Sequence, residues 1–277
     1  MRDKTWFRRR RFFPYDYGEA LLSDMSDLLE EDPDEVKPAC MLITGQSDTG
    51  KSALLREFLD RHPARPNPEG NAFQRPVICI NVPEGGSETK LWSRAFAALG
   101  SPKIGTGNAG DREQAFLRLL RNVGVKVICL DEIHNLQSRG ASSQRKALVL
   151  LKDFANEVGV PIIATGTPVA RTVIKQDDQF LSRFDTHELL PWDDPLRVAT
   201  LLCAYERELG FDGETVLVEE DVIDWVIASA AGQLGAIVKR FKRAAWRAYE
   251  NGRDHVAFED LKKVRVKTVG ENARLTS

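Results

Sequence analysis

The stretch MLITGQSDTGKS, from Met41 to Ser52, decides the fold. An apolar run ends there in small and polar residues, and the part that begins at Gly45 fits the pattern GxxxxGK[ST] without a gap. A loop without bulky side chains lets backbone N–H groups wrap closely around phosphates, and the helix that follows turns the positive end of its dipole toward them. The pattern therefore predicts a phosphate-binding loop between a buried strand and a helix.

Two residues at the end of this loop have specific chemistry. Lys51 can reach the β- and γ-phosphates of a nucleotide, and the hydroxyl of Ser52 can ligate Mg²⁺. The alternative interpretation is a glycine turn followed by a surface lysine, which the flanking strand and helix patterns disfavour. We expect the nucleotide to be bound by Gly45, Gln46, Ser47, Asp48, Thr49, Gly50, Lys51 and Ser52.

The composition limits the class of protein. The chain has 277 residues and a net charge of −2, so nucleic-acid binding would need basic residues gathered on one face or a surface built by an oligomer. The four cysteines form no CxxC motif, which is typical of free thiols in a reducing compartment. No run approaches the ~20 apolar residues of a membrane span, and the basic N-terminus lacks an apolar signal core. We therefore expect a cytoplasmic protein with no membrane partner.

Short apolar segments alternate with helical patterns up to Pro191, and only helical patterns follow. Continuously apolar strands indicate a parallel sheet that is buried on both faces between helices. We expect strands at 40–44, 77–82, 125–130, 161–165 and, weakly, 187–190, and helices at 51–61, 88–99, 111–122, 142–158, 168–182, 195–209, 219–231, 235–250 and 258–266.

These patterns predict three regions. Residues 1–38 form a segment that is first basic (Arg8 to Arg11), then acidic with helical spacing over 16–35, and packs on the core. Residues 39–191 form an α/β core, and residues 192–277 form a helical lid and a tail. The predicted fold class is thus an α/β three-layer sandwich with a five-stranded parallel sheet, plus a small all-helical C-terminal lid.

The stretch VICLDEIHNL supplies the second half of the predicted site. Asp131 and Glu132 follow an apolar strand, at the carboxyl end where open α/β sheets bind ligands. Asp131 would hold Mg²⁺, directly or through water, and Glu132 would polarise the attacking water as a general base. The alternative is a helix cap by Asp131, which the phosphate loop upstream disfavours.

Two further stretches add polar residues to this edge. In PIIATGTPVA, Thr165 or Thr167 would hydrogen-bond the γ-phosphate or the water, and Thr167 could also cap the helix after Pro168. In QFLSRFDTHELLPW, Arg183 is either an arginine finger that enters a neighbour's site or an ordinary surface ion pair. The chain contains neither an NKxD-like nor an LSGGQ-like sequence, which disfavours a GTPase or an ABC transporter ATPase and leaves adenine as the expected base.

Taken together, these residues resemble the AAA+ ATPases, and the DEIHN box with the DDQFLSRFDTHELLPW stretch resembles the TniB branch, related to TnsC and the phage Mu B protein. The resemblance covers residues 15–250. It implies an ATP-switched ring or helical filament on double-stranded DNA that recruits a TniA/TnsB-like transposase, works with a TniQ-like protein, and is disassembled by slow, partner-stimulated ATP hydrolysis.

The resemblance also assigns roles residue by residue. Lys51, Ser52, Asp131 and Glu132 match the family's nucleotide site, Thr167 rather than Thr165 matches its sensor, and Arg183 matches its arginine finger. The chain departs from the family pattern at one position, since the usual sensor-II arginine is missing. The corresponding region reads GQLGA from Gly232 to Ala236, and Lys239 and Arg240 follow a turn later.

Three basic regions are candidates for DNA contact. In the family, the segment after the second strand faces the pore, and any residue there could equally be solvated. The Arg8 to Arg11 cluster could contact phosphate or neutralise the acidic segment, and the run from Lys239 to Arg247 is interpreted mainly as an amphipathic lid helix with a solvated face. The expected DNA contacts are Lys90, Arg94, Lys103, Thr106 and Arg112.

The leading hypothesis is therefore an ATP-dependent, sequence-nonspecific DNA-binding regulator of transposition that uses ATP and Mg²⁺. The first alternative is an AAA+ loader or initiator in replication or repair, which the lack of room for a separate DNA-binding domain after the lid disfavours. The second is a nucleotide-bound scaffold without turnover, which the missing sensor-II arginine mildly favours.

Overall fold

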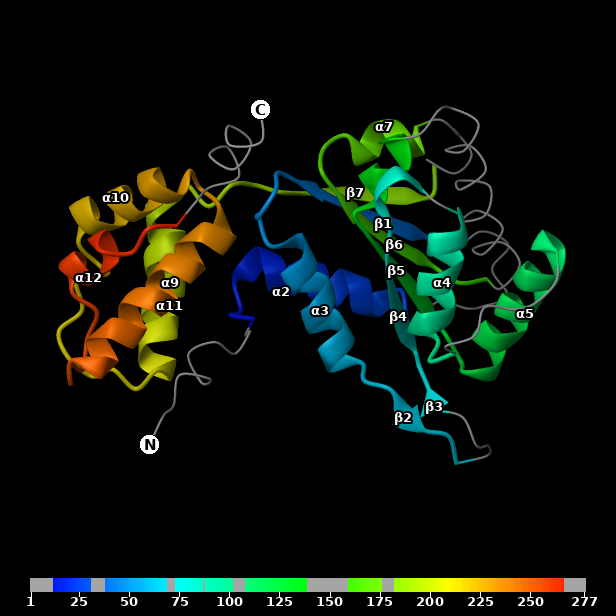
Figure 1. Cartoon of the computed structure of the whole chain (residues 1–277), viewed down its shortest axis with the longest axis horizontal. Coiled ribbons are helices and arrows are strands. Elements are labelled where there is room, and N and C mark those ends of the chain that lie inside the picture. Colours follow the sequence, from blue (N-terminus) through cyan, green and yellow to red (C-terminus); the bar gives the residue numbers. More distant parts are fainter. Residues whose placement is uncertain are drawn as a thin grey trace. The chain divides into compact units, whose positions relative to one another are not determined.

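The computed structural model describes residues 12–30, 38–68, 73–86, 88–101, 108–138, 159–175 and 182–266 (Figure 1). The chain divides into two compact units. The α/β unit takes its described residues from 17–45 and 51–189, and the helical unit takes its described residues from 1–16, 46–50 and 190–277.

The α/β unit is built on a five-stranded parallel sheet with the strand order β4-β5-β6-β1-β7. Every residue of β1, β5 and β6 is buried, as their continuous apolar runs predict. The strands are β1 (Cys40–Gly45), β4 (Val77–Asn81), β5 (Val127–Asp131), β6 (Ile162–Gly166) and β7 (Phe184–Leu189).

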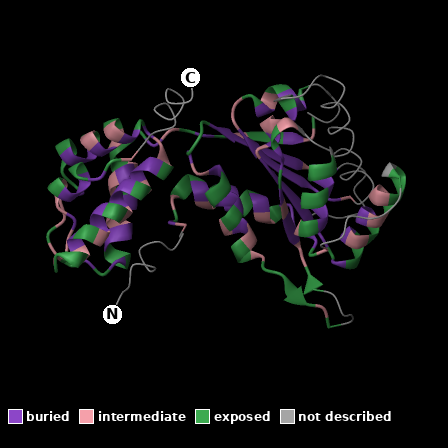
Figure 2. Cartoon of the chain, in the orientation of Figure 1, coloured by how far each residue is buried: buried purple, intermediate pink, exposed green. Residues whose placement is uncertain are grey.

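Successive side chains of each strand point to opposite faces of the sheet. One set, which includes Leu42, Ile128 and Ile162, packs into a single core with the apolar sides of α4 (Glu88–Ala98), α5 (Ala109–Asn122) and α7 (Ala170–Ile174). The opposite set faces α3 (Lys51–Arg61), which contacts β1, β4, β5 and β6. The buried sheet between exposed helix surfaces is visible in Figure 2, and this arrangement is the predicted three-layer sandwich.

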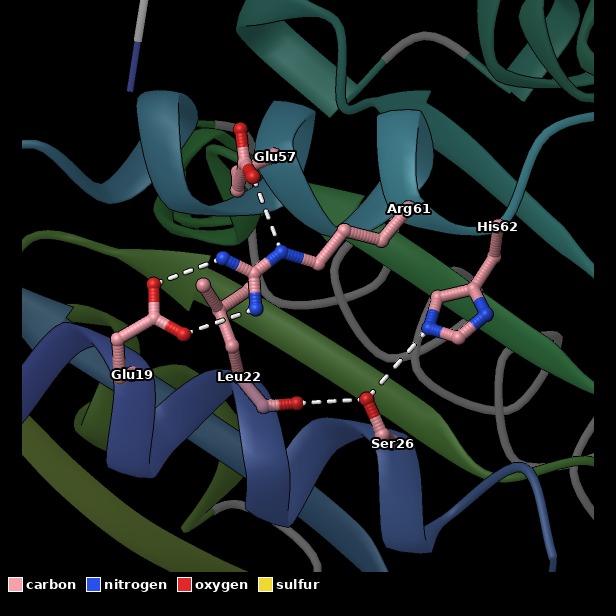
Figure 3. Close-up of polar contacts among 6 residues, drawn as sticks. All are labelled: Glu19, Leu22, Ser26, Glu57, Arg61 and His62. Atoms are coloured by element: carbon pink, nitrogen blue, oxygen red, sulfur yellow. Dashed lines mark hydrogen bonds and ion pairs between the residues drawn. The ribbon is translucent and has the colours of Figure 1, made fainter. Parts of the chain in front are cut away.

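The N-terminal helix α2 (Asp16–Asp27) is joined to α3 by polar contacts (Figure 3). Arg61 donates to both carboxylate oxygens of Glu19 at 2.9 and 2.7 Å and to Glu57 at 2.9 Å. The hydrogen bond from Arg61 lowers the pKa of Glu19. Beside it, Ser26 contacts His62 at 3.5 Å, and burial together with the nearby arginines lowers the pKa of His62. Buried Leu21, Leu22 and Met25 give the same helix its apolar side.

The helical unit consists of α9 (Pro195–Glu208), α10 (Glu220–Ala230), α11 (Leu234–Glu250) and α12 (Phe258–Lys262). Asp194 caps α9 by accepting from the N–H of Arg197, and a proline occupies the first turn. Phe13 from the N-terminal segment packs against Tyr205, with 3.6 Å between the ring centroids. Residues from all four helices form a core that is separate from the core of the α/β unit.

Several element boundaries differ from the prediction. Strand β7 begins at Phe184, three residues before the predicted 187–190, and Leu190 lies outside it and is exposed. Strand β7 is an edge strand in which only Phe184 and Leu189 are buried, which weakens its apolar signal. Helix α12 ends at Lys262 rather than at 266, α7 covers only Ala170–Ile174 of the predicted 168–182, and α2 covers the first part of the predicted 16–35.

The structure also contains short elements that were not predicted: the 3₁₀ helices η1 (Glu84–Gly86) and η2 (Ile133–Ser138) and the antiparallel pair β2 (Arg65–Pro66) and β3 (Phe73–Gln74). The predicted helix at 142–158 lies outside the described residues, as do 31–35 and 176–181. Within the described part of the chain, no helix has both the length and the apolarity that crossing a bilayer requires. The predicted boundaries at 38/39 and 191/192 stay predictions.

Candidate nucleotide site

The predicted phosphate loop connects the end of β1 to the start of α3, where the motif requires it to be. Asp48 and Gly50 have positive φ angles of 62° and 108°, so the loop uses the left-handed backbone region that favours glycine. Lys51 is only 5% exposed, and its Nζ donates to the carbonyl of Gly45 at 2.8 Å. A buried ammonium is costly unless it is hydrogen-bonded, so this position is built for a lysine with anionic or carbonyl partners.

The middle of the loop, residues 46–50, belongs to the helical unit and is held there by hydrogen bonds to two of its main-chain carbonyls. Trp192, which is fully buried, donates from Nε1 to the carbonyl of Thr49 at 3.2 Å. Gly235 at the start of α11 donates from its N–H to the carbonyl of Asp48 at 3.3 Å. A Cβ atom on Gly50 would lie 3.0 Å from Leu234, so the loop also packs tightly there.

Trp192 is itself fixed by an aromatic and cationic cluster. The ring of Tyr15 meets it edge-on at 5.2 Å, and the guanidinium of Arg197 lies 3.8 Å from its ring centroid. Such contacts favour one orientation of the indole ring. The hydrogen bond to the loop is therefore made by a side chain that packing has already oriented.

Asp131 ends β5 with a carboxylate that is 7% exposed. Its Oδ1 accepts from the hydroxyl of fully buried Thr165 at 2.6 Å and from the N–H of Glu132 at 3.0 Å. The first of these is a short, charge-assisted bond of the stronger kind. Two donors on one oxygen hold the carboxylate in a single orientation at the carboxyl edge of the sheet.

Glu132 follows with a positive φ angle of 61°, which is uncommon for a residue with a side chain. One of its carboxylate oxygens lies 3.2 Å from Nε2 of His134. The other ring nitrogen of His134, Nδ1, accepts from the N–H of Thr167 at 3.3 Å. His134 thus connects the predicted general base to the residue that follows β6.

Two thiols lie side by side beneath this edge. Cys79 and Cys129 are register partners in β4 and β5. Burial raises the pKa of Cys79 to about 12 and raises that of Cys129 as well. All four cysteines of the chain are free, as predicted, and these two are neutral thiols with little nucleophilic character.

The structure therefore brings Asp131 and Thr165 into contact at the ends of β5 and β6, and it places Lys51 at the start of α3, directly after the loop that follows β1. Ser52 is exposed in the first turn of α3. Thr167 contacts the site through its N–H to His134, whereas it is Thr165 whose hydroxyl contacts Asp131. The predicted helix cap by Thr167 is wrong, because α7 begins after Val169 and has no side-chain cap.

Arg183 lies directly before β7 and is half-buried, and its carbonyl accepts from the N–H of Cys40 at 2.8 Å. This bond places the arginine beside the first residue of β1. Its role as an arginine finger stays a prediction. No role was predicted for His134. The signal available in the sequence was its place in the DEIHN box, two residues after the paired acidic residues.

The basic residues expected to contact DNA have different surroundings. Lys90 and Arg94 lie one turn apart on the exposed side of α4. Arg94 donates to the main-chain and side-chain oxygens of Asn81 at 2.6 and 2.9 Å, so it is anchored at the end of β4. Arg112 is half-buried on α5. Lys103, Thr106 and the Arg8 to Arg11 cluster lie outside the described residues.

The basic run lies on the amphipathic helix α11 with Lys239, Arg243 and Arg247 exposed, as predicted, whereas Arg240 departs from the solvated face. Arg240 is 6% exposed, its guanidinium lies 4.8 Å from the ring centroid of Trp225, and it donates to the carbonyl of Ser229 at 3.3 Å. Arg240 therefore belongs to the interior of the helical unit. In the turn where a sensor-II arginine is expected, the N–H of Gly235 instead donates to the carbonyl of Asp48 in the phosphate loop.

The sheet order, the loop and the paired acidic residues define a P-loop ATPase fold of the AAA+ type. A family model described as "Bacterial TniB protein" matches residues 4–194, and the chain belongs to this family. Among curated protein sequences, no match to the chain was found.

Solved structures show the same fold at low sequence identity. The ORC1 protein of Aeropyrum pernix, solved in complex with DNA, matches with a TM-score of 0.65 and 18% identity over 98% of this chain and 67% of that one. A Walker-type ATPase of Pyrococcus abyssi gives a TM-score of 0.58 and 20% identity over 88% and 69% of the two chains. Domain III of the replication initiation protein DnaA of Thermotoga maritima gives 0.54 and 14% over 90% and 91%.

Proposed function

We propose that this chain is a cytoplasmic, Mg²⁺-dependent ATPase that assembles on double-stranded DNA and regulates transposition. The observation that carries the proposal is the buried Asp131 carboxylate, fixed by Thr165 at the carboxyl edge of the sheet, in a chain whose phosphate loop holds a buried Lys51. A carboxylate and an ammonium are costly to bury, and a triphosphate with its cation compensates both.

The residues present fit a magnesium ion. Both donors to Asp131 use Oδ1, which leaves Oδ2 for a cation, and the exposed hydroxyl of Ser52 is an oxygen ligand of the kind Mg²⁺ prefers. The described residues contain no cluster of three or more His, Cys, Asp or Glu side chains suited to a metal, so the remaining ligands would be phosphate and water. When bound, Mg²⁺ neutralises charge that develops on the phosphates.

The chain's own residues supply the rest of the chemistry. Lys51 and the loop N–H groups bind the phosphates, and Glu132 accepts a proton from the attacking water. We further propose that Thr167 senses the γ-phosphate. Arg183 of a neighbouring subunit is proposed to stabilise charge in the transition state, which makes hydrolysis depend on assembly.

For DNA, we propose that Lys90 and Arg94 contact the phosphate backbone, with Lys103, Thr106 and Arg112 in the same segment. Membership of the TniB family supports an assembly that recruits a TniA/TnsB-like transposase and works with a TniQ-like protein. The likeness to replication initiators does not favour a loader function, because at these identities it supports the fold alone.

Electron microscopy with duplex DNA and a non-hydrolysable ATP analogue tests the assembly. The wild-type chain should form rings or filaments, Lys51→Ala should abolish them, and Glu132→Gln should trap them when ATP replaces the analogue. Asp60→Asn on the exposed side of α3 is a matched control for the lost carboxylate and should behave as wild type. Assembly that proceeds equally well without nucleotide would contradict the proposal.

Salt titration of DNA binding tests the contact surface. If Lys90 contacts a phosphate, Lys90→Ala should reduce the slope of log K against log salt concentration by about 1. Arg118, exposed on α5, serves as the control because the proposal gives it no DNA contact. An unchanged slope for Lys90→Ala would show that Lys90 does not contact a DNA phosphate.

A scaffold without turnover is the second candidate, and the burial of Arg240 favours it, since that arginine cannot serve as the missing sensor-II residue. Phosphate release in the presence of DNA separates the two functions. Turnover that Glu132→Gln abolishes supports the ATPase, and tight ATP binding without turnover supports the scaffold.

A further inference from the structure

His134 occupies a position that the proposed chemistry has not yet used. Its ring is 22% exposed and lies between two residues of the candidate site, with Nε2 3.2 Å from the carboxylate of Glu132 and Nδ1 3.3 Å from the N–H of Thr167. The two contacts use both ring nitrogens, so the imidazole forms a bridge between the end of β5 and the end of β6.

The Thr167 contact determines which nitrogen carries the proton. A backbone N–H can only donate, so Nδ1 must accept and is unprotonated. In the neutral ring the proton therefore lies on Nε2, which then donates to the carboxylate of Glu132. A main-chain group thus selects the tautomer that can hold the glutamate.

The strand order gives this bridge a direction. Strand β6 lies between β5 and β1, and β1 leads into Gly45 and Lys51. A link from Glu132 toward the end of β6 therefore turns the carboxylate toward the side of the sheet where the phosphate loop begins. Without this link, the carboxylate, which is 34% exposed, would be free to turn toward solvent.

The chain provides room for the ring in this place. A Cβ atom on Gly166, the last residue of β6, would lie 3.2 Å from Nδ1 of His134 and 2.8 Å from the Cβ of Ala170. Only a glycine lets the imidazole approach this closely to the main chain that follows β6.

We propose that His134 is a positioning residue: its Nε2–H orients the Glu132 carboxylate toward the γ-phosphate side of the site, and the N–H of Thr167 fixes the tautomer that does so. The inference rests on the proposed ATPase function. It assigns His134 no contact with the nucleotide.

Two conservative variants separate the two contacts. In His134→Gln the amide nitrogen replaces Nε2 and can still donate to Glu132, whereas in His134→Asn the amide oxygen replaces Nδ1 and can accept only from Thr167. We expect His134→Ala and His134→Asn to lower kcat for DNA-stimulated ATP hydrolysis about 10- to 100-fold, since a misplacement of about 1 Å has effects of this size. His134→Gln should retain kcat within about threefold, and KM for ATP should stay unchanged in all three.

Controls distinguish positioning from a structural role. His62→Gln replaces a partly buried histidine of the same unit outside the site and should leave kcat unchanged. In the Glu132→Gln background, His134→Ala should cause no further loss. Full activity of His134→Asn, or a loss in His134→Gln as large as that in His134→Ala at equal thermal stability, would overturn the inference.

Nitrogen NMR of the nucleotide-free protein gives a readout that does not depend on activity. The His134 signals, identified by their loss in His134→Gln, should show a protonated Nε2 and an unprotonated Nδ1, and the opposite tautomer would overturn the inference. If the wild-type chain binds ATP but Glu132→Gln does not affect turnover, the proposed function fails instead, and the tautomer measurement still stands on its own.

Discussion

Replacing Thr165 by valine isolates the bond that holds Asp131. The side chains have similar shapes, and both suit a buried strand position, so the main loss is the hydroxyl that donates to Oδ1 at 2.6 Å. The bond is charge-assisted, and both partners are buried. Removing such a donor costs about 1.5–3 kcal/mol, because the carboxylate stays buried with only the N–H of Glu132 on that oxygen.

Thr44→Val is the matched control. Thr44 is equally buried, lies on β1 of the same sheet, and donates to the carbonyl of His187 at 3.1 Å, which is a neutral acceptor. The same substitution there should cost about 0.5–1.5 kcal/mol. The difference between the two variants therefore reports the charge on Asp131.

Thermal unfolding without nucleotide measures both variants in the same unit. For a unit of this size, 1 kcal/mol corresponds to about 2–4 °C in Tm, so Thr165→Val should lower Tm by about 3–12 °C and by more than Thr44→Val does. In the Asp131→Asn background, the cost of Thr165→Val should fall to that of a neutral bond. Equal losses at Thr165 and Thr44, or an unchanged loss in that background, would refute the reasoning.

Three further predictions concern other parts of the chain. Trp192→Phe keeps an aromatic side chain but removes the N–H that donates to the carbonyl of Thr49 and part of the buried indole volume. It should therefore destabilise the protein by at least about 1–3 kcal/mol in thermal unfolding and weaken nucleotide binding, and unchanged affinity would contradict a role in shaping the loop. The pKa of His62 is lowered below its usual 6.5, so its neutral form contributes stability above pH 6.5 that is lost as pH falls through the lowered value. His62→Gln should therefore lose less Tm than the wild type when the pH falls from about 7.5 to about 5.5. An equal loss of Tm in both proteins would show that His62 does not cause this pH dependence. Iodoacetamide should alkylate half-exposed Cys203 before fully buried Cys129 in the native protein, and mass spectrometry showing the reverse order would contradict the burial described here.

The sequence predicted best where a local pattern was strong. The phosphate loop, the strands before Gly45 and Asp131, and α3 followed from apolar runs and glycine placement, because burial on both faces leaves a continuous apolar signal. Strand β7 was weakly predicted because only its end residues, Phe184 and Leu189, are buried, and polar Asp185 and Thr186 follow its first residue.

Contacts between segments distant in sequence could not be predicted. The choice between Thr165 and Thr167 depends on the pleat of β6, which places the hydroxyl of Thr165 at Asp131. The burial of Arg240 depends on Trp225 of the preceding helix, which covers its guanidinium. In both cases the deciding partner lies on another element, and local spacing carries no information about it.

The assignment of residues 46–50 to the helical unit has a consequence for domain exchange. A chain cut after Leu189 would retain every strand of the sheet, yet the carbonyls of Asp48 and Thr49 would lose the donors on Gly235 and Trp192. The module that can be exchanged between relatives is therefore discontinuous in sequence. Residues 46–50 must be exchanged together with residues 190–266, because otherwise the new lid does not match the nucleotide loop of the recipient protein.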